Sequence, residues 1–167
     1  MEETLYFFWG KKLGKENSNE AFSHRWILAA LSDFNGQLQA RDIVRFLKFA
    51  TESPNPATYA DRVLMPMDIR NAIPPCSSEK IVEYGNEIKG LNSLFDKLKK
   101  VDDPGRELPL NMDIVHLSEN ERKQLEDFGF LKMHNGEYYM PEIIRNALGY
   151  RYSKGARPKV LALSLSR

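Results

Sequence analysis

Apolar residues recur at helical spacing over the first third of the chain. In residues 20–31 and 37–51 they lie three or four positions apart, which places them on one face of a helix. Residues 5–9, Leu-Tyr-Phe-Phe-Trp, form a continuous apolar run within a further helix-like segment, 3–13. The pattern predicts three helices in this region.

Prolines interrupt the pattern farther along the chain. Residues 67–73 are typical of a short helix, which we expect the prolines at 74 and 75 to end, because proline lacks the amide hydrogen and clashes with the preceding turn. A long amphipathic helix is then predicted from residue 77 or 78 to residue 98. Residues 102–105, Asp-Asp-Pro-Gly, form the clearest linker in the chain and indicate a domain boundary.

The most specific local pattern begins after this linker. Ser118 and Glu121 have the spacing of a capping box, so a helix is predicted to begin there and to end at Gly129. Two short apolar runs then flank Asn135-Gly136, the dipeptide typical of a two-residue hairpin turn. A second helix is predicted over residues 141–148.

A helix followed by a two-stranded wing and a closing helix is the pattern of the second half of a winged helix, a helix-turn-helix variant. The sequence therefore predicts a mainly α fold with three parts. A helical bundle is expected over residues 1–101, a winged-helix domain with a small β-hairpin wing over residues 106–150, and a basic tail over residues 151–167.

The tail is basic because residues 143–167 contain six basic side chains and no acidic ones. The six are Arg145, Arg151, Lys154, Arg157, Lys159 and Arg167. Such a segment can follow the phosphates of a nucleic acid. It can equally be a loop followed by a strand, residues 159–163, that docks on a partner domain.

Composition narrows the class of protein. The net charge of +1 gives no global argument for nucleic-acid binding. No apolar run approaches the roughly 20 residues needed to span a bilayer, and the N-terminus lacks the pattern of a signal peptide. We therefore expect a soluble, cytoplasmic protein with no membrane partner. The single cysteine, Cys76, agrees with a reducing compartment.

Patterns that would indicate an enzyme are missing from the sequence. It contains no glycine-rich phosphate loop with a lysine, no His-Glu-x-x-His pair and no nucleophile elbow. His24, His116 and His134 lie far apart and have no ligand partner at helical spacing. We therefore predict no catalytic residues, no metal site and no cofactor held by this chain alone.

Two groups of residues are candidates for binding. Arg41 is expected in the first turn of a helix, where the helix dipole favours an anion, so it could bind an anionic ligand there or form a local ion pair. The second group is predicted to contact nucleic acid or a partner protein through the wing and the tail. It comprises Lys132, His134, Asn135, Arg151, Lys154, Arg157 and Lys159.

Residues 39–47, Gln-Ala-Arg-Asp-Ile-Val-Arg-Phe-Leu, together with residues 62–72 and 77–80, resemble the helical lid that follows the nucleotide-binding core in bacterial P-loop ATPases of the AAA-like and STAND-like types. Residues 118–148 are similar to the winged helix that follows this lid. The resemblance implies that Arg41 senses the terminal phosphate of ATP, bound with Mg²⁺ by a missing upstream domain. Ala40 departs from the family, which often has proline there.

Two functions are compatible with these patterns. The first is a non-catalytic regulatory or docking module at the C-terminal end of a larger P-loop ATPase, with the upstream domain or another protein as partner. The second is a free-standing winged-helix DNA-binding protein. Residues 119–127, the candidate recognition helix, carry four acidic and two basic side chains, which DNA would repel. This favours the first function.

Overall fold

The structure is a computed structural model that describes residues 2–17, 21–52 and 54–165, with side chains from residue 5 onward. Within these residues the chain is mainly helical. Its helices are α1 (Glu2–Trp9), α2 (Ser23–Leu31), α3 (Ala40–Glu52), α4 (Pro66–Glu87), α5 (Leu91–Lys99), α6 (Met112–Val115), α7 (Glu119–Asp127), α8 (Glu142–Leu148), α9 (Ala156–Leu165) and the 3-10 turn η1 (Asp103–Gly105). Residue 20, where the second helix was predicted to begin, lies outside the described range.

Four short strands form two small sheets. They are β1 (Glu107–Leu108), β2 (Lys132–His134), β3 (Glu137–Tyr139) and β4 (Arg151–Tyr152). β1 pairs with β4 in parallel, and β2 pairs with β3 in the antiparallel sense. Mainly α structure with a small β content was predicted, and this level of the prediction is confirmed.

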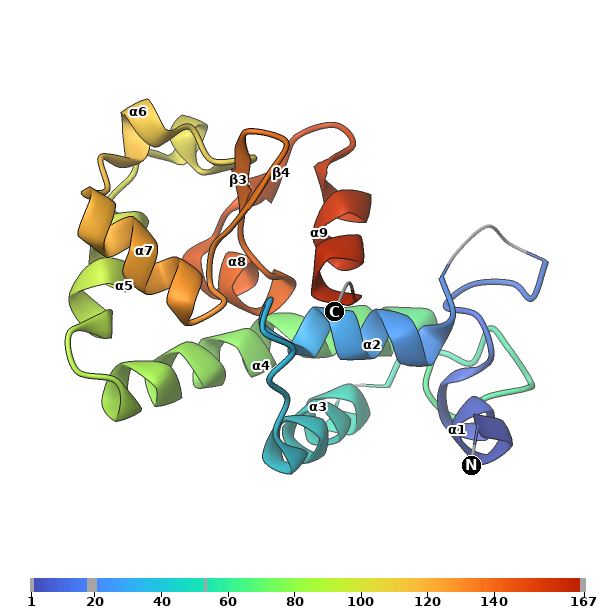
Figure 1. Ribbon diagram of the computed structural model, residues 1–167. Helices are drawn as coiled ribbons and strands as arrows, with labels where there is room; N and C mark the ends of the chain where they lie inside the picture. Colours follow the sequence, from blue (N-terminus) through green and yellow to red (C-terminus); the bar gives the residue numbers. More distant parts are fainter. Residues whose placement is uncertain (1, 18–20, 53, 166–167) are drawn as a thin grey trace.

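The long helix α4 organises the packing. Figure 1 shows it running across the molecule, with α3 on one side and α2 and α8 on the other, and all three pack against it. The predicted helices over residues 67–73 and from 77 or 78 to 98 are wrong in their bounds, because α4 continues through Pro74 and Pro75 to Glu87 and α5 begins at Leu91. Ser77 and Ser78 donate hydroxyl hydrogen bonds to the carbonyls of Ile73 and Pro74, at 2.8 and 3.1 Å.

Burial explains why α4 tolerates its prolines. Ile69, Ile73, Cys76 and Tyr84 are all buried on α4, so packing on both sides of the prolines outweighs the lost backbone hydrogen bonds. The helix ends instead near Gly90, whose φ of +87° is a conformation that glycine adopts easily.

Residues on both sides of segment 102–105 belong to one hydrophobic core. α8 packs against α4 and α5, and the buried Tyr150 hydroxyl donates to the carbonyl of Leu98 at 3.0 Å. The division at residues 101–106 into a helical and a winged-helix domain remains a prediction. No helix within the described residues is both long and apolar enough to cross a membrane.

The local predictions for residues 118–139 are confirmed. Ser118 accepts a hydrogen bond from the Glu121 amide at 3.3 Å and donates its own amide to the Glu121 carboxylate at 2.7 Å, which is a capping box. Asn135 and Gly136, with φ of +52° and +80°, form the turn between β2 and β3.

Residues 151–165 fold back on the molecule as β4 and α9, and the alternative of a strand over residues 159–163 is wrong. Ala156, Val160, Leu163 and Ser164 are buried, and this spacing of three and four residues is that of one helix face. α9 packs against α2, as Figure 1 shows. Arg167, counted in the predicted tail, lies outside the described residues.

Candidate interaction site

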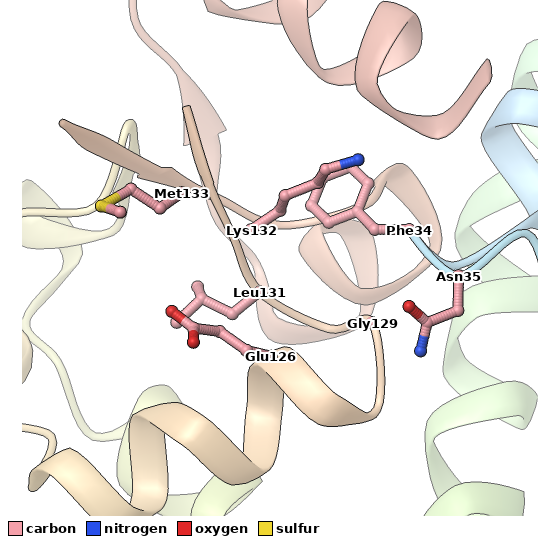
Figure 2. A pocket seen from close by; sticks show the side chains of 7 residues that line it. All are labelled: Phe34, Asn35, Glu126, Gly129, Leu131, Lys132 and Met133. Carbon is pink, nitrogen blue, oxygen red and sulfur yellow. The ribbon is translucent and has the colours of Figure 1, made fainter. Parts of the chain in front are cut away.

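A hollow of about 320 Å³ lies where the loop between α2 and α3 meets the end of α7 and the start of β2. Figure 2 shows its lining residues, which come from the α2–α3 loop and from the continuous stretch 126–133. They are Phe34, Asn35, Glu126, Gly129, Leu131, Lys132 and Met133. We call this hollow the wing pocket.

Two hydrogen bonds hold the α2–α3 loop against α7. The Phe34 amide donates to the carbonyl of Gly129 at 2.9 Å, and the Asn35 side-chain amide donates to the carbonyl of Asp127 at the same distance. Gly129 allows this approach, because an added Cβ would lie 2.8 Å from the Asn35 backbone nitrogen. The wall of the wing pocket therefore depends on a glycine that joins two distant segments.

The wing pocket combines groups of different polarity. Lys132 reaches over the Phe34 ring, with its ammonium 6.0 Å from the ring centroid. Glu126 supplies a carboxylate and Asn35 an amide, while the buried Leu131 supplies an apolar wall. A polypeptide can use this mixture, because it presents donors, acceptors and apolar side chains together.

The hairpin beyond the wing pocket is exposed. His134 and Asn135, two of the predicted contact residues, lie at its tip, and the side chain of Met133 is 58% exposed. An exposed methionine is adaptable in shape and suits a protein interface. With Lys132, the structure thus brings three predicted contact residues to one edge.

Lys159 joins this hairpin from α9. Its ammonium lies 3.5 Å from the Glu137 carboxylate and 3.3 Å from the Tyr139 hydroxyl. Glu137 has its pKa lowered, first by the hydrogen bond from Tyr139 and further by the charge of Lys159. The charge of Lys159 is therefore opposed at close range by an acidic residue of β3.

The other predicted contact residues lie against different segments. Arg151 approaches Asp103 at 3.6 Å, and Arg157 lies over the ring of Trp26, 5.9 Å from its centroid. Lys154 is exposed in the turn before α9. Arg145, from the same basic stretch, forms a 3.0 Å ion pair with the buried Glu142.

The outer face of α7 carries both signs of charge. Glu119, Lys123 and Asp127 are exposed on it. Glu121 has its pKa lowered to about 2, first by the hydrogen bond from Lys97 at 2.7 Å and then by those from Ser118. α7 thus presents no continuous positive surface.

Arg41, the predicted nucleotide sensor, forms ion pairs between α3 and α4. Its guanidinium lies 2.9 Å from Glu83 and 2.9 Å from Glu87, and its side chain is 46% exposed. The hydrogen bond with Glu87 is the main cause that raises the pKa of Arg41. The sequence allowed either an anionic ligand or a local ion pair for Arg41, and in the structure Arg41 forms local ion pairs. Its role as a nucleotide sensor stays a prediction.

A deeper ion-pair network lies beside Arg41 and was not predicted from the sequence. Lys80 and Asp42 are 2.9 Å apart, with side chains only 4% and 5% exposed. Arg45 adds contacts to Asp42 at 3.2 Å and to Glu79 at 2.7 Å. These residues join α3 to α4, and the sequence gave no signal for the pairs between the two helices, because their partners are 34 and 38 residues apart.

The wing pocket was also missed, although Lys132 was predicted. Phe34 gives the only available signal, because an apolar side chain in a polar loop indicates tertiary contact. Within the part of the chain that the structure describes, no group of His, Cys, Asp and Glu residues could hold a metal ion. Searches against protein-family models, curated proteins and solved structures found no match to this chain.

Proposed function

We propose that the chain is a non-catalytic docking module that binds another protein through the β2–β3 hairpin and the wing pocket. The observation that supports it is the pairing of charge along the basic stretch. Arg145, Arg151 and Lys159 each lie within 4 Å of a carboxylate, which lowers the positive charge that this stretch offers to the phosphates of a nucleic acid. A mixed surface of this kind suits a protein partner.

The order of the elements supports a winged-helix fold for this half of the chain. After α5 come η1, β1 and the strand position at Leu110, and then α6, α7 and the hairpin. Leu110 forms a β-bridge with Tyr138, which would supply the third strand of a winged helix. Fold alone does not decide the ligand, so the proposal depends on the surface.

The proposed setting is a larger P-loop ATPase, on the strength of the resemblance of residues 39–47, 62–72 and 118–148. In this setting the partner is the nucleotide-binding domain, and α3 and α4 serve as its lid. Arg41 contacts Glu83 through Nε and Glu87 through Nη2, so a phosphate would compete with these two carboxylates for its guanidinium.

Titration of the chain with a mixed-sequence DNA duplex at several salt concentrations tests the choice of partner. The proposal expects no binding at low salt. Strong binding that weakens steeply with salt would overturn it in favour of the DNA-binding alternative. Combined neutralisation of Arg151, Lys154, Arg157 and Lys159 would then show whether these residues carry the binding.

The docking surface is tested with the P-loop domain of the parent ATPase as the binding partner. Met133→Glu should weaken the complex at least tenfold, since it places a charge in the proposed interface. Leu28→Glu is the matched control, because Leu28 is 42% exposed on α2, outside the wing pocket and outside the lid helices α3 and α4. Equal affinity of the two variants would refute the proposed surface.

The ATPase setting has its own test in the mass of the native protein. We expect a polypeptide larger than the 19.3 kDa of this chain, with a glycine-rich loop and lysine on its N-terminal side. A native mass of 19.3 kDa would remove that setting. The docking surface would then have to bind a separate protein.

A further inference from the structure

A second hollow, of about 390 Å³, lies between α9 and the N-terminal half of the chain. It shares no lining residue with the wing pocket. Its wall is formed by Leu13, Ala21, Trp26, Arg70, Arg157, Pro158 and Leu161. α9 and α2 lie side by side in Figure 1, and these two helices supply four of the seven residues. The volume falls in the range of small-molecule sites, about 300 to 1,000 Å³.

One part of this hollow is apolar. Leu13 and Trp26 are buried, at 3% and 5% exposure, and Leu161 is half-buried on α9. Together with Pro158 they offer aliphatic and aromatic surface to a ligand. Covering the apolar atoms of a ligand with this wall is favourable, because it removes them from water. The wall offers little to a bare inorganic ion.

The charged side chains among the described lining residues of the hollow are both basic, namely Arg70 and Arg157. Arg157 lies within 4 Å of no carboxylate of the described residues, although its charge is one of the causes that lower the pKa of the buried Glu142. Its guanidinium carbon lies 5.9 Å from the Trp26 ring centroid. It also stands in the first turn of α9, whose helix dipole adds positive potential at that end.

We propose that this hollow binds a small organic anion with an apolar body, namely a carboxylate or phosphate carried on an alkyl or aryl group. The guanidinium of Arg157 receives the anionic head through charge-assisted hydrogen bonds. Trp26, Leu13 and Leu161 cover the apolar body. The site is independent of the proposed docking function, because its residues lie outside the hairpin and the wing pocket.

Calorimetric titration with three related compounds tests the site. The probes are 4-phenylbutyrate, 4-phenylbutyl phosphate and the neutral 4-phenylbutanol. We expect at least one anion to bind at least tenfold more tightly than the alcohol, and the stronger of the two anions identifies the head group. Equal binding of all three, or no binding by any, would overturn the proposal.

Two variants locate the binding in the hollow. Arg157→Gln should weaken binding of the anion about tenfold and leave the alcohol unchanged. Arg151→Gln is the matched control, because Arg151 is an exposed arginine that pairs with Asp103 outside the hollow. Arg157 is itself exposed, so its replacement should preserve the helical circular dichroism spectrum. Unchanged anion affinity in Arg157→Gln would refute the assignment.

Discussion

Gly129 and Gly136 allow the contact that builds the wing pocket to be measured against an internal control. Both residues have positive φ, +71° and +80°, so alanine is strained at either position. A left-handed conformation costs an L-residue about 1–2 kcal/mol. Gly136→Ala should lower the free energy of unfolding by only this amount, because nothing lies within 4 Å of its added Cβ.

Gly129→Ala should lower the free energy of unfolding by more than Gly136→Ala does. Its Cβ would lie 2.8 Å from the backbone nitrogen and from the side-chain carbon Cγ of Asn35, and the loop must move to relieve the clash. Overpacking of this kind typically costs about 1–3 kcal/mol, so the total should be about 2–5 kcal/mol. Movement of the loop would also strain the 2.9 Å hydrogen bond from the Phe34 amide to the Gly129 carbonyl.

Urea unfolding followed by circular dichroism measures both variants. The expected result is a free energy of unfolding lower for Gly129→Ala than for Gly136→Ala by about 1–3 kcal/mol. Amide exchange at Phe34 should also become faster in Gly129→Ala alone. Equal destabilisation would show that the α2–α3 loop does not pack closely against Gly129. The contact that forms the wall of the wing pocket would then be refuted.

Three further predictions concern buried or paired groups. Lys80→Met should lower the free energy of unfolding, measured in urea, by about 3 kcal/mol. This is the lower end for a broken buried ion pair, because Asp42 keeps its ion pair with Arg45. Lys48→Met at an exposed position should change the same free energy by under about 0.5 kcal/mol. Glu121 has a folded pKa of about 2, below the ordinary 4.5, so its stabilisation is present above pH 4.5 and lost as the pH falls toward 2. The deficit of Glu121→Gln in acid unfolding should therefore vanish over that window. Burial raises the pKa of Cys76 to about 12, so iodoacetamide should label it slowly in the folded protein and quickly in urea.

The features that the sequence predicted correctly are local. The capping box of Ser118 and Glu121 and the hairpin turn at Asn135 and Gly136 each depend on residues no more than three positions apart. Backbone preference and short-range hydrogen bonds decide such elements. Such elements form wherever tertiary packing is compatible with them.

The errors arose where packing outweighed local preference. Pro74 and Pro75 indicated a helix end, but the buried faces before and after them keep α4 continuous. α9 was missed although Val160, Leu163 and Ser164 have helical spacing, because its basic residues suggested an extended tail. The wing pocket could not be predicted, since the contact of Asn35 with Asp127 joins residues 92 positions apart.

The same limit governs the functional interpretation of charge. A count along the sequence finds six cations and no anions in residues 143–167, which suggests a phosphate-binding segment. In the folded chain, the partners of Arg151 and Lys159 are Asp103 and Glu137, which lie outside that window and are brought close by the packing of β4 and α9. A nucleic acid that bound to Arg151 and Lys159 would have to break these ion pairs. If the pairs stayed intact, binding would release few counterions, because these two cations already have neighbouring carboxylates. A protein partner has no such requirement, since it can match both signs of charge around the exposed Met133.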